Sequence, residues 1–95
     1  MKRAQAYALI DAERLLQAEK WSGSGRWGTG DCSSAQVSPI VKVAVLTEEC
    51  GEVARAVLDD SDGLTAELVQ VAAVAVAWLE ALPVPSDDVV ARWSA

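Results

Sequence analysis

Two long helix-forming runs joined by a short acidic link constrain the fold of this chain more than any other feature. The first run begins at Ser38-Pro39, a typical helix N-cap followed by a proline in the first turn, and continues to about position 58. The second covers about 64–82, and neither run contains the turn signals that separate strands. Because the DDSDG link is only five residues long, the two helices are expected to be antiparallel neighbours.

The second of these helices is apolar on almost every side. Between Val69 and Ala77 the only polar residue is Gln70, and a helix without a polar face is normally buried all round. Hydrophobic residues make up 52% of the 95 residues, which is more apolar surface than so small a monomer covers easily. The sequence therefore predicts that another subunit completes the core, through a face that resembles a domain core.

Short local sequence features predict the structure of the rest of the chain. A helix is expected over about 3–20, and four glycines in SGSGRWGTGD then form a Gly/Ser-rich loop at about 21–37. A loop of this length in a compact domain is usually functional or disordered. Two prolines end the second run, and Ser86 caps a short final helix in which Trp93 is expected to pack inward. Residues 1–95 are thus expected to form one all-α domain, a helical bundle of three long helices plus a short C-terminal helix, with a core completed by oligomerisation.

Composition excludes several classes of function. The chain has 14 acidic and 8 basic residues, a net charge of −6, which argues against binding nucleic acid through phosphate neutralisation. There is no histidine, which excludes His-based triads and most zinc sites. The N-terminus does not resemble a signal peptide, and the longest uncharged helical run, 68–79, is shorter than the roughly 20 residues that span a bilayer. We therefore expect a cytoplasmic protein without a membrane partner, with both cysteines reduced and Cys50 in the core.

Three glutamates and one glutamine are the candidate metal-binding residues. At about 100° per residue, Glu49 and Glu52 lie roughly 60° and 120° to one side of the apolar seam of the first run. Glu67 and Gln70 lie roughly 40° and 100° to the same side of the second seam. In antiparallel helices these offsets fall on one common face, so the four side chains are expected to converge. Their oxygens suit Mg²⁺ or Mn²⁺, although glutamates on a helix are also ordinary solvated surface residues.

Four further residues are candidates for substrate binding. Lys20 and Trp21 stand where the first helix meets the loop, and they are suited to phosphates and a base. A solvent-reaching lysine and a tryptophan that closes the bundle end explain them equally well. Trp27, next to Arg26, suits a lid over a nucleotide or an oligomer contact. Lys42 lies N-terminal to the acids on their helix, where it would either contact phosphate or remain a surface lysine.

The acids fall in a sequence context that resembles a known family. Glu49-Cys50-Gly51-Glu52, followed after fourteen residues by Glu67-Leu68-Val69-Gln70, is similar to the ExxE…ExxD signature of the MazG-like all-α nucleoside triphosphate pyrophosphohydrolases. The flanking text VLTEECGEVARAVLDD and LTAELVQVAAVAVAWLEAL, and the N-terminal block ERLLQAEKW, look like small phage and actinobacterial members. The resemblance covers about 12–82.

This resemblance implies a chemistry. It makes Glu49, Glu52 and Glu67 the catalytic acids that bind Mg²⁺, in an enzyme that cleaves an NTP or dNTP between the α and β phosphates to NMP and pyrophosphate. It also implies a homo-oligomer, dimer or tetramer, located in the host cytoplasm if phage-encoded. Gln70 stands where the family commonly has Asp, and a neutral amide binds Mg²⁺ more weakly. An alternative is therefore a catalytically weak or inactive protein that binds nucleotide or a host protein.

Overall fold

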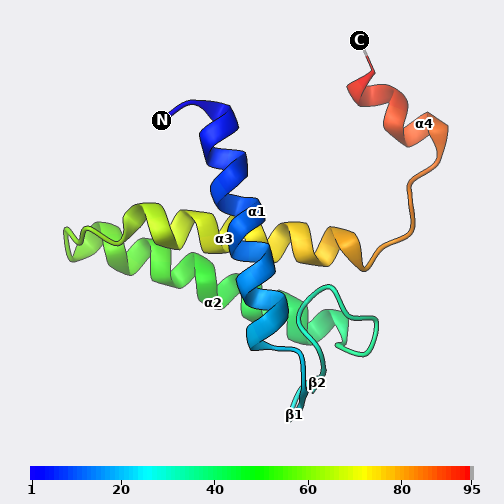
Figure 1. The fold of residues 1–95 in the computed structure, drawn as a ribbon, viewed down its shortest axis with the longest axis horizontal. Helices are drawn as coiled ribbons and strands as arrows, with labels where there is room; N and C mark the ends of the chain where they lie inside the picture. Colours follow the sequence, from blue (N-terminus) through cyan, green and yellow to red (C-terminus); the bar gives the residue numbers. More distant parts are fainter. Residues whose placement is uncertain (95) are drawn as a thin grey trace.

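The chain is helical along most of its length. The computed structural model describes residues 1–94; Ala95, the last residue of the expected domain, lies outside the described part. The expected all-α class is confirmed, with three long helices and a short C-terminal one, and two strands of two residues each form a small hairpin inside the expected loop. In chain order the elements are α1 (Arg3–Lys20), β1 (Ser24–Gly25), β2 (Gly28–Thr29), α2 (Pro39–Leu58), α3 (Leu64–Glu80), α4 (Asp87–Val90) and the 3₁₀ turn η1 (Ala91–Trp93) (Figure 1).

The antiparallel hairpin of α2 and α3 forms where the sequence predicts it. Ser38 caps α2, because its Oγ accepts a hydrogen bond from the Val41 amide at 3.3 Å, and Pro39 occupies the first helical position. After Leu58, Asp60 adopts a left-handed conformation with a φ of 50°, which aspartate tolerates better than most residues. The chain then reverses, and α3 packs along α2 (Figure 1).

Helix α1 crosses this hairpin instead of lying along it. It packs on α3, and within residues 1–94 its backbone does not come close to that of α2; Figure 1 shows it passing over the hairpin at a steep angle. The molecule measures 43 × 41 × 21 Å, so its thin direction holds two helix layers of about 10 Å each. The hairpin forms one layer and α1 the other.

The core is small and is built from small side chains. Val74 and Ala77 of α3 pack with Cys32 of the loop, and two partly buried side chains of α2 lie against them. No large side chain among the described residues is fully buried. In the single chain α1 and α2 cover α3 in part, but one stripe stays open, and its Leu79 is 66% exposed. Although α3 is strongly apolar, no helix in the described part of the chain is long and apolar enough to cross a membrane.

The apolar seam expected to face inward on α2, made of Val43, Leu46, Cys50, Val53 and Val57, is buried along one edge only. Cys50 was expected in the core but is exposed, as are Val43 and Val57 on the same stripe. α2 meets α3 through the other edge of this seam, where Leu46 lies against the core and Val53 is half-buried. The physical reason is that the seam is broad, and spacing alone does not say which of its edges α3 covers. The buried cysteine is Cys32.

The loop between α1 and α2 is held in one shape by a glycine and an aspartate. Gly28 has a φ of 128°, and a Cβ at this position would lie 2.5 Å from the carbonyl oxygen of Gln36, so the backbone requires glycine there. Asp31 accepts hydrogen bonds from the amide and the hydroxyl of Ser33, as in an Asx turn. Cys32, the next residue, is buried and anchors the turn to the bundle.

The C-terminal segment leaves the bundle. Of the elements in residues 1–94, α4 and η1 contact only each other (Figure 1). The expectation that Trp93 packs inward is wrong, because its side chain is 71% exposed. The prolines at 83 and 85 cannot continue α3, and the extended stretch that contains them carries the last helix away from the core.

Candidate functional site

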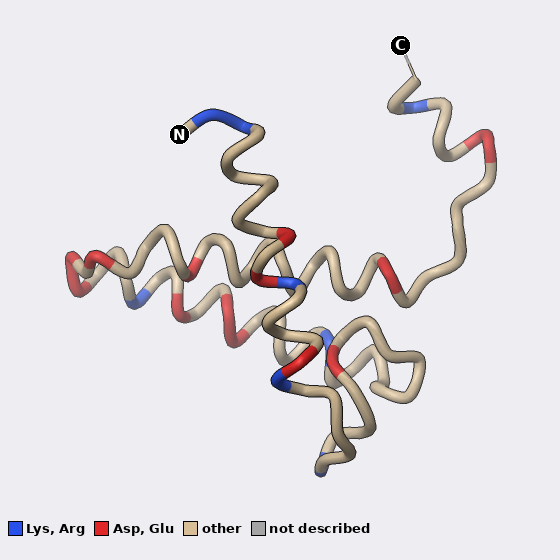
Figure 2. Tube along the Cα trace, viewed as in Figure 1, with Lys and Arg blue, Asp and Glu red and all other residues tan. Residues whose placement is uncertain are grey.

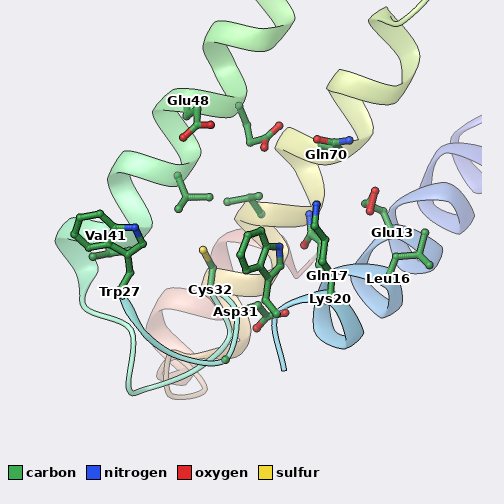
Figure 3. Close-up of a pocket in the computed structure, with 15 residues that line it drawn as sticks. Glu13, Leu16, Gln17, Lys20, Trp27, Asp31, Cys32, Val41, Glu48 and Gln70 are labelled. Carbon is green, nitrogen blue, oxygen red and sulfur yellow. The ribbon is translucent and has the colours of Figure 1, made fainter. Parts of the chain in front are cut away.

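A pocket of about 540 Å³ lies where α1, the loop, α2 and α3 meet (Figure 3). This volume is in the range of small-molecule sites, roughly 300–1,000 Å³. The pocket is strongly acidic, with four carboxylates and a single cation in its lining. The charged and aromatic residues of the lining are Glu13, Lys20, Trp21, Trp27, Asp31, Glu48 and Glu49.

Glu49 is the most unusual group in this pocket. Its Oε2 is buried and has no hydrogen-bond partner among the described residues, although buried polar atoms are nearly always paired. Burial raises the pKa of Glu49, and neighbouring negative charges raise this pKa further. In falling order of effect, these charges are those of Glu67, Glu48, Glu52 and Glu13. Glu49 therefore lies at the centre of a negative cluster and lacks a compensating cation.

The four candidate metal-binding residues are brought together only in part. Glu49 of α2 and Gln70 of α3 line the same pocket (Figure 3). Glu52 and Glu67 lie close enough to influence the pKa of Glu49, but in the structure of residues 1–94 they are not part of the pocket lining. Within that range, no three Cys, Asp or Glu side chains are gathered closely enough to hold a metal ion.

The oxygen donors in the pocket are too few to enclose a metal ion completely. They fit a metal ion that binds together with its substrate. Mg²⁺ commonly binds through one or two carboxylates, keeps several waters, and takes its other ligands from substrate phosphates. The unpartnered Oε2 of Glu49 and the nearby amide of Gln70 are hard oxygen donors of this kind. The residues present therefore fit a divalent cation with few protein ligands.

Three of the four candidate substrate-binding residues line the pocket. Lys20, at the end of α1, places its Nζ 5.2 Å from the centre of the Trp21 ring, and Arg26 lies over Trp27 at 4.7 Å. Both pairs are cation–π contacts. The two rings remain more than half exposed, so each keeps surface on which a flat ligand can stack.

Lys42 is placed elsewhere. Only 4% of its surface is exposed, and it lies outside the lining of the pocket. Its positive charge acts instead on the buried thiol of Cys32. Burial raises the pKa of this thiol, and the charge of Lys42 offsets part of the rise. The reason is that position 42 is on the stripe of α2 that faces inward, so the loop and α3 cover it.

Sequence reasoning missed a buried ion-pair network beside the pocket. Arg14 of α1 is a charged residue, but it is only 8% exposed. Its Nη1 donates to Oδ2 of Asp31 at 2.9 Å and to Oε1 of Gln17 at 3.3 Å, and its Nε donates to Oε2 of Glu80 at 2.8 Å. Burial alone lowers the pKa of Arg14, but its carboxylate partners outweigh burial and raise the pKa.

Two of the missed residues belong to the pocket itself. Glu13 contributes one of the four acids of the lining, from α1, and its carboxylate points toward the pocket (Figure 3). Asp31 contributes from the loop. A signal for Asp31 is present in the sequence, because Gly-Asp-Cys-Ser is a typical Asx-turn context. For Glu13 and Arg14 the sequence gives none, since both are ordinary residues of an amphipathic helix.

Comparisons with known proteins add no assignment. The chain matches no protein-family model, no curated protein and no solved structure. The MazG-like resemblance therefore stays a prediction, carried by the acids and their flanking residues. The geometry of the pocket is an observation that does not depend on this resemblance.

Proposed function

We propose that this protein is a Mg²⁺-dependent nucleotide pyrophosphohydrolase that cleaves an NTP or dNTP between the α and β phosphates, giving NMP and pyrophosphate. The observation that carries the proposal is the unpartnered, buried Oε2 of Glu49 in the wall of a nucleotide-sized pocket. An oxygen of this kind among neighbouring acids calls for a hard cation. The aromatic and cationic groups at the loop end of the same pocket suit the base and phosphates of a nucleotide.

Each group in the pocket has a defined part in this proposal. Glu49 and Gln70 would hold the metal, and Glu52 and Glu67 would keep negative charge next to them. When bound, Mg²⁺ or Mn²⁺ supplies charge neutralisation at the phosphate oxygens and lowers the pKa of a coordinated water. Lys20 would bind the phosphates of the substrate and of the released pyrophosphate. Trp21 and Trp27 would stack on the base and exclude water from it.

The proposal is tested by replacing the acids with their uncharged amides. Glu49→Gln, Glu52→Gln and Glu67→Gln should each lower pyrophosphate release by about 100-fold or more, because loss of groups that merely support metal ligands already costs roughly 10- to 100-fold. The assay uses a panel of NTPs and dNTPs with Mg²⁺ or Mn²⁺. Glu19→Gln is the matched control, since Glu19 is an exposed acid of α1 outside the pocket. Unchanged turnover in the first three variants would sink the proposal.

A second candidate is a catalytically weak or inactive relative that binds nucleotide or a host protein. The neutral amide at Gln70 favours it, as does the small number of protein oxygens in the pocket. A nucleotide analogue that cannot be cleaved between the α and β phosphates separates the two candidates. Binding of this analogue, seen as a change in tryptophan fluorescence, without turnover of any natural nucleotide would favour the second candidate.

The proposal includes the cellular location and the oligomeric state of the protein. We infer a cytoplasmic homo-oligomer, dimer or tetramer, in the host cytoplasm if the chain is phage-encoded. Support comes from the many large apolar side chains that one chain leaves exposed and from the net charge of −6, which disfavours a nucleic-acid partner.

A further inference from the structure

The hairpin of α2 and α3 has one face that is apolar, exposed and free of charge. The exposed residues on this face recur at spacings of three and four along α2, and of four, seven, four and three along α3, a pattern typical of helices that pack against other helices. We call these residues the outer face. They are Ile40, Val43, Thr47, Cys50, Ala54 and Val57 from α2, and Leu64, Leu68, Ala75, Leu79 and the following Leu82 from α3.

The residues of both helices point to the same side of the hairpin. At about 100° per residue they lie roughly 20–120° to one side of Leu46 in α2, and roughly 20–80° to the same side of Val71 in α3. In antiparallel helices, offsets of one sign share a face. Glu49 and Gln70, which line the pocket, lie roughly 60° and 100° to the opposite side. Helix α1 and the pocket therefore occupy one face of the hairpin, and nothing in residues 1–94 covers the centre of the other.

All charged residues of these two helices avoid the outer face. On the same angular scale, all seven charged residues of α2 and α3 lie outside the half of each helix that forms the outer face. Figure 2 shows α3 without charge between its first and last acids. The charged residues concerned are Lys42, Glu48, Glu49, Glu52 and Arg55 on α2, and Glu67 and Glu80 on α3.

The single chain also exposes more surface than its mass predicts. Its accessible area is 7230 Å², whereas a compact monomer of this mass has about 5,200 Å². Part of the difference belongs to the C-terminal arm. The total difference, about 2,000 Å², is nevertheless well above the roughly 800 Å² that each partner buries in a standard stable interface. The chain therefore has enough surplus surface for a subunit interface.

We propose that the outer face is the interface with a second copy of this chain, whose own outer face packs against it. A two-fold contact pairs one patch with itself, and stripes spaced three and four apart interdigitate well with copies of themselves. Each copy carries a net charge of −6, so close approach is least opposed where the surface is uncharged. The pocket lies on the other side of the hairpin and stays open in the pair. This pairing rests on the homo-oligomer of the proposed function and gives it a defined interface, but it does not depend on catalysis.

The experiment measures the mass of the full chain in solution by sedimentation equilibrium, with substitutions on and off the outer face. The wild type should have at least twice the mass of the 10.0-kDa chain. Leu68→Glu and Val43→Glu place a charge in the outer face and should at least halve the mass of the assembly. Leu15→Glu is the matched control, because Leu15 is 69% exposed but lies on α1; it should leave the mass unchanged. A monomeric wild type, or variants of Leu68 and Val43 that keep the wild-type mass, would overturn the proposal.

Thiol labelling gives a second readout on the unmodified sequence, in case a variant fails to fold. Cys50 is exposed in the single chain and lies within the outer face, whereas Cys32 is buried. Labelling of Cys50 should slow roughly tenfold or more once most chains are paired, because it then proceeds through the free monomer. Cys32 should react slowly at every concentration. A Cys50 rate that does not change on dilution through the range in which the mass changes would place the interface elsewhere and refute the proposal.

Discussion

Glu49 is the residue whose ionised form is least well accommodated in the described fold. One of its oxygens is buried without a partner, and other glutamates surround it. A carboxyl group whose pKa is higher in the folded state than in the unfolded state favours folding when protonated and opposes it when ionised. Groups with such shifted pKa values cluster at functional sites. In the proposed function, a bound cation would offset this cost.

Replacing Glu49 with Gln is expected to stabilise the chain at neutral pH in the absence of divalent metal. Below the ordinary carboxyl pKa of 4.5 both states hold the proton, so the amide brings little advantage. As the pH rises, the unfolded chain ionises first, and the wild type loses stability until the pH passes the raised folded pKa. Urea unfolding at about pH 4 and about pH 7.5 measures this difference. A Glu49→Gln variant that is less stable than the wild type at the higher pH would contradict it, and Glu19→Gln serves as the control.

At the scale of elements, three segments meet at the guanidinium of Arg14. It joins α1 to Asp31 of the loop at 2.9 Å and to Glu80 at the end of α3 at 2.6 Å. The side chains of Arg14 and Asp31 are 9% and 8% exposed, whereas that of Glu80 is 50% exposed. The pair with Asp31 is therefore buried, and loss of one partner would leave an uncompensated charge, at a cost of about 3–5 kcal/mol. The pair with Glu80 resembles a surface ion pair, with a contribution of about 0–1 kcal/mol.

Asp31 and Glu80 should therefore differ in how much stability is lost when each is replaced. Asp31→Asn is expected to lower the free energy of unfolding by about 3 kcal/mol at neutral pH, and Glu80→Gln by less than about 1 kcal/mol. Burial raises the pKa of Asp31, but hydrogen bonds from Ser33 and the charge of Arg14 outweigh it and lower the pKa below 3.8. The contribution of Asp31 is thus present above that pH and is lost as the pH falls through the folded pKa. Equal losses in the two variants, measured by chemical denaturation, would disprove the distinction.

The elements themselves were predictable, but their facing sides were not. Ser38-Pro39, the glycines before it and the prolines after α3 mark helix ends by local rules that tertiary structure rarely overrides. The side of α2 that meets α3 is not a local property, because Leu46 and Cys50 lie on opposite edges of one apolar seam. The convergence of Glu49 with Gln70 depended on angles within the helices. Glu13 reached the pocket because α1 crosses the hairpin, and no spacing in the sequence encodes that crossing.

As a whole, the molecule is a thin plate with an arm. Its radius of gyration is 14.8 Å, against about 12.4 Å for a compact chain of this length. The plate is two helix layers thick, and the arm formed by α4 and η1 projects from it (Figure 1). A shape of this kind exposes large apolar side chains on both the plate and the arm, and only the residues between the two layers form a core.

The arm should contribute little to the stability of the plate. Deleting residues 84–95 is expected to change the free energy of unfolding by no more than about 0.5 kcal/mol, as for surface changes that touch no packed group. Far-ultraviolet circular dichroism should still report the three long helices. A larger loss would mean that Val84 or Trp93, both exposed in the single chain, packs against a plate in solution.

Pocket residues and outer-face residues alternate along α2 between Ile40 and Cys50. One inserted or deleted residue inside this helix would rotate everything beyond it by about 100°. Apolar side chains would then turn toward the pocket while acids turned toward the opposite surface. The helical register of α2, more than any single side chain, therefore keeps the two surfaces apart. Changes of length are tolerable only outside it, in the loop before α2 or in the arm.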